Sequence, residues 1–365
     1  FGSRFYRLSA PPPYTGGRIF PHRLVTLFHI TFPTAPATSV ARLVAPSSNT
    51  SSKSSNLSCH DNSDNNNTTN NNDKTIQRTN KPTKTNADPT QQTHLTLSMP
   101  VAELKGCSLY YEDSDPEQKS NLPAAIFLHG AAGSAASWWQ QWPSFKRHYR
   151  CIAYDARGYH RSTDDSGAGM DALIEDLEAF VDYLKLTKVS LIAQSMGGRA
   201  AIGFAVRNPT ATDALVMCNT WGAFDWPAHW KMAEHLSSAP KDFEVGPIKG
   251  LSKRFQDENP ELATLFESQK NASLKPKPKL GGAQPGGPTL EEVTRLTIPL
   301  LCITSNEDAV IPSPLVEGLA TAIAGAECVS FSGVGHSAYF EVPGKFNEAV
   351  LAFLSKHTQA PATTP

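Results

Sequence analysis

The sequence lacks an excess of charge of either sign, and it lacks long apolar runs. Its 33 lysine and arginine residues nearly balance 34 aspartate and glutamate residues, which leaves a formal net charge of −1 at pH 7. No basic stripe stands out, so nothing indicates nucleic acid or an anionic membrane as a partner. The apolar stretch at residues 24–32 is too short and too interrupted to span a bilayer. We therefore expect a soluble protein.

Paired cysteine motifs are lacking as well. The six cysteines are scattered without Cys-x-x-Cys spacing, so the sequence indicates neither a zinc site nor a disulfide framework. Four of them, Cys151, Cys218, Cys302 and Cys328, fall in or beside apolar runs, where a free thiol packs as a small hydrophobe. A reduced, cytoplasmic setting is the simplest interpretation.

Residues 1–98 lack the apolar periodicity of a folded domain. They are rich in Ser, Thr, Asn and Pro, and such a composition cannot bury enough apolar surface to offset its ordering entropy. We expect a disordered extension. Because the chain opens on Phe1 and Met99 precedes the domain, upstream translation is one origin for it. A transit peptide, which would imply an organelle, is the alternative, since several arginines and many hydroxyl residues precede the first acidic residue, Asp61.

From residue 99 onward, short apolar runs alternate with helical patterns. A hairpin is predicted around Lys105-Gly106, and further strands at residues 124–128, 150–154, 189–193, 214–218, 300–304 and 328–331. Helices are predicted at residues 170–184, 199–207, 315–323 and 346–354. This alternation predicts an α/β fold with a mostly parallel central sheet flanked by helices. In such sheets the site lies at the carboxyl ends of the strands.

One interval, at about residues 220–297, has no convincing strand. It contains aromatic-rich and helical-looking pieces, followed by a soft stretch at residues 275–288. A long insertion of this kind inside a compact domain is usually functional. We predict a mostly helical cap over the strand ends, within a domain that spans residues 99–365.

Residues 189–207 combine a strand, a tight turn and a helix, with Ser195 at the tip of the turn. Such a turn strains the backbone of the serine, projects its hydroxyl away from the sheet and requires small neighbours. Ala193, Gly197 and Gly198 meet that requirement, although Ala193 stands where the pattern usually has glycine. The turn predicts a nucleophile elbow, and a helix-capping serine is the plainer alternative.

A nucleophilic serine needs a base, and the base needs a third group that holds its tautomer. Asp308 follows the strand predicted at residues 300–304, and His336 lies in a glycine-flanked loop after the strand at 328–331. The order serine, aspartate, histidine is the one found in α/β hydrolases. Glu307, beside Asp308, is the competing carboxylate.

Four motifs agree in order and spacing over about residues 100–356. They are His129-Gly130, Asp155-x-Arg157-Gly158, Ala193-x-Ser195-x-Gly197, and Gly335-His336-Ser337 followed by Glu341-x-Pro343. On these motifs the chain resembles the α/β-hydrolase superfamily, in its branch of single-domain serine hydrolases with a helical cap. Ser195 in place of an aspartate nucleophile argues against the epoxide-hydrolase and haloalkane-dehalogenase chemistries of the same fold.

The resemblance implies a role for each matching residue. Ser195 would be the nucleophile, His336 the general base and acid, and Asp308 the orienting carboxylate. The backbone N–H groups of Ala131 and Met196 would form the oxyanion hole, and no metal or organic cofactor is implied. His129, Asp155 and Arg157 would hold the loops beside the site. His160 departs from the pattern, because this branch often has a second glycine there.

The substrate is the least determined feature. We predict that Trp138, Trp221, Phe224 and Trp226 line an apolar pocket, and the alternative is that they only pack the cap onto the body. The expected activity is hydrolysis of a small apolar carboxylic ester or lactone through an acyl-enzyme. Two alternatives stay open: a hydrolase of carbon–carbon bonds in a β-diketone-like substrate, and a hydrolase-fold small-molecule receptor.

Overall fold

The computed structural model describes residues 100–273 and 282–358. The extension predicted at residues 1–98, with the possible start at Met99, lies outside the described residues. In the described part, one sheet has the strand order β1-β2-β4-β3-β5-β6-β7-β8. Its strands are β1 (Val101–Leu104), β2 (Cys107–Asp113), β3 (Ala124–Leu128), β4 (Arg150–Tyr154), β5 (Val189–Gln194), β6 (Thr212–Cys218), β7 (Leu300–Ser305) and β8 (Glu327–Phe331).

Pairing in the sheet is mostly parallel. β1 and β2 form the predicted antiparallel hairpin, and β2 also pairs antiparallel with β4. All other neighbours, from β4 through β3 to β8, are parallel. Every residue of β3, β4, β5 and β7 is buried, as expected of strands covered on both faces. The predicted fold class is confirmed.

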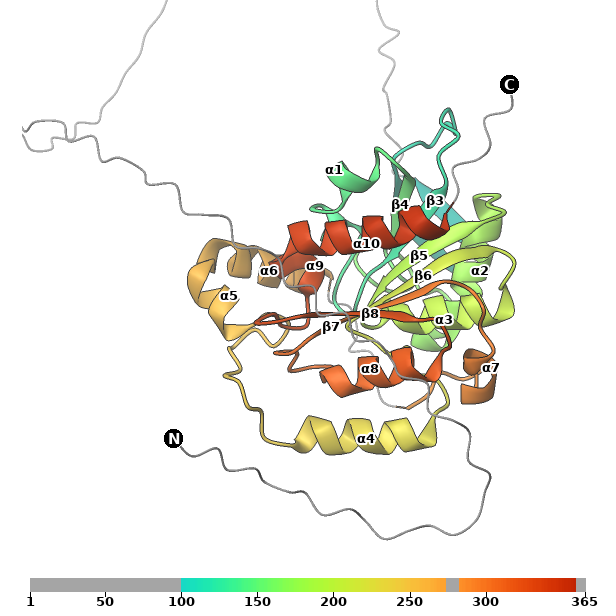
Figure 1. The fold of residues 1–365 in the computed structure, drawn as a ribbon. Coiled ribbons are helices and arrows are strands. Elements are labelled where there is room, and N and C mark those ends of the chain that lie inside the picture. The colour runs from blue at the N-terminus through green and yellow to red at the C-terminus, as the bar shows by residue number, and fades with distance from the viewer. Residues whose placement is uncertain (1–99, 274–281, 359–365) are drawn as a thin grey trace, which may run out of the picture. The chain divides into compact units, whose positions relative to one another are not determined.

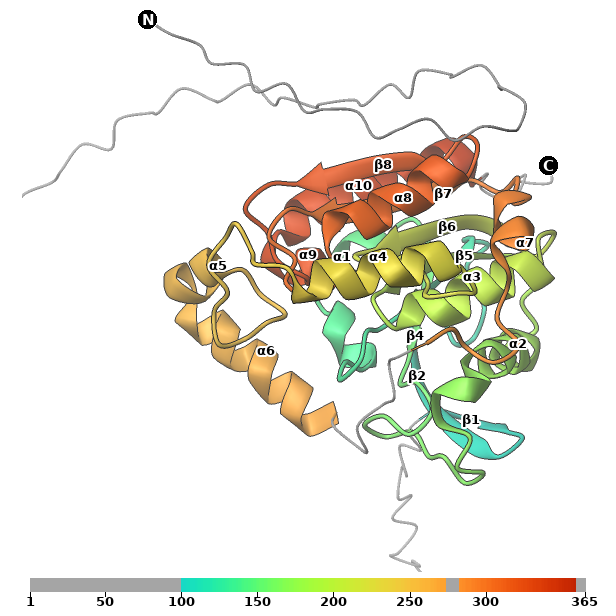
Figure 2. The ribbon, with the colours of Figure 1, turned by 90° about the horizontal axis from the view of Figure 1, so that it is seen from below.

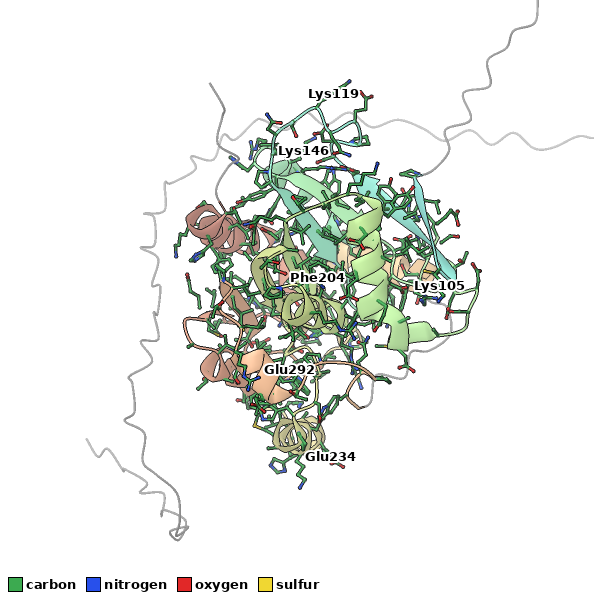
Figure 3. All side chains as sticks on the ribbon, turned by 90° about the vertical axis from the view of Figure 1, so that its right-hand side faces the viewer. Lys105, Lys119, Lys146, Phe204, Glu234 and Glu292 are labelled. Carbon is green, nitrogen blue, oxygen red and sulfur yellow. The ribbon has the colours of Figure 1, made fainter. Side chains whose placement is uncertain are left out.

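Helices cover both faces of this sheet (Figure 1). One face carries α1 (Trp142–Phe145) and α10 (Pro343–His357), and the other carries α2 (Leu173–Tyr183), α3 (Gly197–Arg207) and α8 (Ser313–Ala322). Large side chains fill each layer, and burying one phenylalanine contributes about 1.5–3 kcal/mol. Figure 3 shows Phe204 of α3 in the interior of its layer, whereas Lys105, Lys119 and Glu234 lie at the rim. Three short elements precede α1, α2 and α10 along the chain: η1 (Ala135–Trp138), η2 (Gly169–Ala172) and α9 (Ala338–Glu341).

Four helices occupy the described part of the interval between β6 and β7. They are α4 (Pro227–Ser238), α5 (Lys253–Glu258), α6 (Pro260–Ser273) and α7 (Leu290–Thr294). α4 packs on α8, where a ring nitrogen of His229 lies 2.8 Å from the Leu315 carbonyl oxygen, and α7 packs on α3. α5 and α6 lie side by side and stand off to one side of the sheet (Figure 2). The interval therefore divides into two pairs of helices. α4 and α7 pack on the layer that contains α3 and α8, whereas α5 and α6 extend beyond the ends of the strands (Figure 2).

Some features are absent from the described ranges. No helix at residues 100–273 or 282–358 is both long and apolar enough to cross a membrane. The same ranges hold no cluster of three or more His, Cys, Asp or Glu side chains arranged for a metal ion. The five cysteines in them are free thiols, and four of these are buried.

Candidate functional site

Ser195 occupies the turn between β5 and α3. Its φ is 50°, in the left-handed region that favours glycine, so the backbone is strained as expected of an elbow. The Ser195 N–H donates to the carbonyl oxygen of Cys218, and the Ser195 carbonyl accepts from the N–H of Gly198. A Cβ on Gly197 would lie 2.5 Å from the Leu128 carbonyl oxygen. Glycine at 197 is therefore required by close approach to β3, and a Cβ on Gly198 would instead meet the side chain of Thr220.

Asp308 and His336 meet in the loops after β7 and β8. His336 Nδ1 lies 2.8 Å from Asp308 Oδ2, and both side chains are buried. Asp308, not the neighbouring Glu307, is thus the carboxylate that contacts the histidine. Because a carboxylate only accepts, Nδ1 carries the proton, which leaves Nε2 as the nitrogen that can take one.

The Asp308 carboxylate is held by three further hydrogen bonds. Oδ1 accepts from the backbone N–H groups of Val310 and Ile311, each at 2.8 Å, and Oδ2 accepts from Asn219 Nδ2 at 3.0 Å. Asn219 follows β6 with a φ of 49°. Asn219 belongs to none of the four sequence motifs, and its contact with Asp308 becomes visible only in the structure. Together these bonds fix the direction in which the carboxylate faces His336.

The loop after β3 is ordered by His129. Its Nε2 lies 2.8 Å from the N–H of Ala156, and its Nδ1 lies 2.7 Å from the carbonyl oxygen of Gly130. Since Ala156 must donate, Nε2 accepts and Nδ1 carries the hydrogen that Gly130 receives. Burial lowers the pKa of His129, which is consistent with this neutral ring. His129 holds the loop and does not line the cavity described below.

The same loop brings the backbone N–H of Ala131 to the elbow, and the elbow itself supplies the N–H of Met196. Within the described residues, neither the N–H of Ala131 nor that of Met196 donates a hydrogen bond. Both residues stand beside Ser195: Met196 follows it in the chain, and a Cβ on Gly130, the residue before Ala131, would lie 3.1 Å from Ser195 Cβ and would clash with Gln194 Oε1. Glycine at 130 is what allows the loop to approach the serine this closely.

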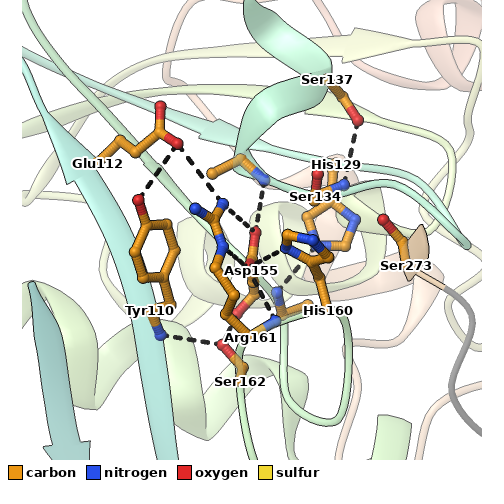
Figure 4. A network of polar contacts seen from close by, with 12 residues as sticks. Tyr110, Glu112, His129, Ser134, Ser137, Asp155, His160, Arg161, Ser162 and Ser273 are labelled. Atoms are coloured by element: carbon orange, nitrogen blue, oxygen red, sulfur yellow. Dashed lines mark hydrogen bonds and ion pairs between the residues drawn. The ribbon is translucent and has the colours of Figure 1, made fainter. Parts of the chain in front are cut away.

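Asp155 organises a buried network on the far side of this loop (Figure 4). Its Oδ1 accepts from the N–H of Ala135 at 2.7 Å, and its Oδ2 accepts from Arg161 Nε at 2.9 Å. Burial opposes ionisation, but the hydrogen bonds from Arg161 and Ala135 lower the pKa of Asp155. Arg161 also lies over the ring of Tyr110. The network anchors the start of η1, and so the loop that precedes it.

His160 belongs to this network and keeps the backbone shape of the glycine it replaces. Its φ is 43°, and its Nδ1 lies 3.1 Å from Asp155 Oδ2. Arg157, also predicted to be structural, forms two hydrogen bonds with the buried carboxylate of Asp176, one of them from Nε at 2.7 Å. Neither residue lines the cavity.

A cavity of about 440 Å³ holds the elbow serine and the histidine. Its inner wall is the loop at residues 130–133 with Ser195 and His336, and its outer wall comes from residues 247–250 and α6. The remaining wall is mainly apolar or uncharged and includes Ser137, Gln194, Val310, Ser337 and Tyr339. Within the described residues the Ser195 hydroxyl makes no hydrogen bond to His336. Such bonds are often long until substrate is bound.

The four aromatic residues predicted to line the pocket lie elsewhere, so that prediction is wrong for this cavity. Trp138 is completely buried, with its ring centroid 4.9 Å from that of Tyr339. Trp221 and Phe224 are buried in the layer that contains α3, and Trp226 stacks on His229 at 3.9 Å. All four serve as packing, which was the alternative interpretation.

Glu341 is a further buried residue beside the histidine loop. Its Oε1 accepts from the N–H of Gly335 at 3.0 Å and from that of Ser252 at 2.9 Å, and its Oε2 accepts from the Ser252 hydroxyl at 2.6 Å. Burial raises the pKa of Glu341, although these hydrogen bonds oppose the rise. The Glu341-x-Pro343 motif thus connects the residue before His336 to the start of α5.

Comparison with known proteins agrees with this architecture. A model of the alpha/beta hydrolase family matches residues 125–349, more than half of the chain. A curated relative, 2-hydroxy-6-oxononadienedioate/2-hydroxy-6-oxononatrienedioate hydrolase of Escherichia coli, is 27% identical over 256 residues, which cover 63% of this chain and 86% of the relative.

Two solved structures are similar in fold. The enol-lactonase of Burkholderia xenovorans is 22% identical with a TM-score of 0.56, and the match covers 70% of this chain and 100% of that one. A thermophilic esterase of Thermogutta terrifontis is 25% identical with a TM-score of 0.55, over 69% of this chain and 95% of that one. On the family match and the sheet that carries it, the chain belongs to the α/β-hydrolase family and is a hydrolase.

Proposed function

We propose that this hydrolase cleaves a small carboxylic ester or lactone through an acyl-enzyme on Ser195. One observation carries the proposal: the strained serine and a histidine paired with Asp308 face the same cavity. The N–H groups of Ala131 and Met196, which have no acceptor within residues 100–273 and 282–358, lie beside them. This set supplies a nucleophile, a base, an orienting carboxylate and two donors for a developing oxyanion.

The proposed reaction has two halves. His336 Nε2 takes the proton of the Ser195 hydroxyl as its oxygen attacks the substrate carbonyl carbon, and Asp308 stabilises the resulting imidazolium. The oxyanion accepts hydrogen bonds from Ala131 and Met196, and removal of one such donor costs about 3–4 kcal/mol in comparable sites. His336 then returns the proton to the leaving oxygen. Water, activated by the same histidine, hydrolyses the acyl-enzyme and restores Ser195.

The outer wall of the cavity supports a proposal about which segment acts as the predicted cap. Residues 247–250 and α6 enclose the cavity opposite Ser195, whereas α4 and α7 pack on the helical layer. We assign the cap function to the segment from residue 247 to Ser273. Its enclosure of the reacting groups favours a small substrate, because the cavity holds only about 440 Å³.

A second candidate activity is hydrolysis of a carbon–carbon bond in a β-diketone-like substrate. The observation that favours it is the Escherichia coli relative, whose name describes an oxo-substituted dicarboxylate and no ester. The same serine, histidine and oxyanion donors would serve this reaction. The two activities differ in the bond broken, so substrates distinguish them.

The test is steady-state hydrolysis by the full chain of short-chain aryl esters, lactones and a β-diketone, with Ser195→Ala beside the wild type. Many turnovers of an ester or lactone, lost in Ser195→Ala, would support the proposal. Cleavage of the diketone alone would favour the second activity. Labelling of Ser195 by a fluorophosphonate with a single turnover would indicate a receptor. No turnover and no labelling would refute the nucleophile assignment.

A further inference from the structure

Two lysines stand on the outer wall of the cavity. Lys249 lies in the segment before α5, and Lys270 lies near the end of α6. Both line the cavity that holds Ser195 and His336, and both side chains are exposed to solvent. They come from separate elements, so their presence on one wall is a product of the fold.

The packing of α6 turns these lysines toward the same space. Phe266 and Lys270 are four residues apart and therefore share one face of the helix. The Phe266 ring packs on Phe340 with centroids 5.0 Å apart, and a Cβ on Gly250 would lie 3.0 Å from the Phe266 ring. The face of α6 that carries Lys270 therefore lies against the turn that carries Lys249.

Neither lysine has an anionic partner in the described residues. Other lysines do have one. Lys253 pairs with Asp257 within α5, and Lys188 pairs with Asp213. No aspartate or glutamate lines the described cavity wall. The dipole of α6 accounts for a lysine at its C-terminal end, but Lys249 belongs to no helix. A recess lined by positively charged side chains concentrates anions.

On these observations, and resting on the proposed function, we infer that the substrate carries a carboxylate at the end remote from its scissile bond. The carbonyl end lies at Ser195, and the acid end lies against Lys249 and Lys270. Between them, Ile248, Phe266 and Val310 contact an apolar middle. Half-esters of dicarboxylic acids and lactones with an acidic side arm fit this arrangement.

The expected effect is on binding of the acid group. An ammonium group that stays partly in water contributes a modest attraction, which corresponds to a change in kcat/KM of about fivefold for each lysine. The contribution should weaken when ionic strength rises from about 0.05 M to about 0.5 M, because salt screens exposed charges. A neutral substrate of the same length should respond to neither change.

The experiment compares two aryl esters, the 4-nitrophenyl half-ester of glutaric acid and 4-nitrophenyl valerate, which has no carboxylate. The full chain is measured as wild type, Lys249→Met, Lys270→Met and the double variant. Lys253→Met, whose lysine is paired and does not line the cavity, is the matched control. We expect the wild type to prefer the half-ester at low salt, the double variant to lose that preference by about tenfold or more, and valerate hydrolysis to stay unchanged.

Two outcomes would overturn the inference while leaving the proposed function intact. One is a wild-type enzyme that hydrolyses valerate as well as the half-ester. The other is a double variant that loses both activities equally, which would make the lysines structural. If neither ester is hydrolysed, calorimetric binding of glutarate monomethyl ester to Ser195→Ala decides: binding that the two lysine substitutions abolish supports the acid site, and no binding refutes it.

Discussion

Replacing Glu341 by alanine tests how the loop that carries His336 is held. Glu341 is the only described side chain that bonds both Gly335, the residue before His336, and Ser252 at the start of α5. Alanine removes all three hydrogen bonds and leaves two backbone N–H groups in a buried position. Glutamine is the matched control, because its remaining oxygen still accepts from both N–H groups.

The magnitude follows from counting the groups left without partners. Each buried N–H without an acceptor costs about 1–3 kcal/mol, so Glu341→Ala should lower the free energy of unfolding by about 3–5 kcal/mol. Glu341→Gln leaves only the Ser252 hydroxyl without its acceptor and also removes a buried charge, which burial disfavours. We expect it to stay within about 1–2 kcal/mol of the wild type.

The value of kcat should depend on how accurately His336 is positioned. A displacement of about 1 Å in a positioning element can lower the rate about a hundredfold. Glu341→Ala should therefore lower kcat about a hundredfold with little change in KM, and Glu341→Gln by less than tenfold. Urea unfolding and steady-state ester hydrolysis measure the two effects. Equal losses in both variants would refute the argument from the two N–H groups. Lost stability with unchanged kcat would show that other contacts, such as Gln194 Nε2 to the His336 carbonyl, suffice to hold the loop.

Two further predictions concern the groups around the serine. Asp308→Asn should lower kcat for esters about ten-thousandfold, because the amide no longer fixes the His336 tautomer. The hydrogen bonds from Val310 and Ile311 should preserve the fold, which thermal unfolding checks. A loss of kcat below tenfold would contradict this role of Asp308. Burial lowers the pKa of His129 below 6.5, so this residue contributes stability above pH 6.5 that is lost as pH falls toward its folded value. Urea unfolding from about pH 7.5 to about pH 5.5 should show that decline. A His229→Gln background removes the other histidine in the described part of the chain whose pKa burial lowers, and a flat profile would refute the prediction.

Much of the fold could be predicted because its signals are local. The buried strands are short apolar runs, and each predicted strand is found within two residues of its expected ends. The elbow is equally local, since Ser195 and its small neighbours form one turn. The contact between Asp308 and His336 was predictable only through the resemblance, because residues far apart in sequence meet when their strands, β7 and β8, become neighbours.

The cavity wall could not be predicted in the same way. A large aromatic side chain signals burial, but it does not signal which interior it enters. Trp221 and Phe224 come soon after β6, and their side chains are buried in the core layer that contains α3 and α8. The segment that does reach the strand ends is largely polar, and Ala263 and Ser273 are the only fully described buried residues of α6. Its one usable signal was the four-residue spacing from Phe266 to Lys270, which sets a hydrophobic contact and a charge on one helical face. The spacing shows where Lys270 points only once the contact of Phe266 with Phe340 is known, because that contact determines which face of α6 lies against the domain. Phe340 lies in α9, which is separated from α6 in the sequence by β7 and β8, so this contact could not be predicted locally.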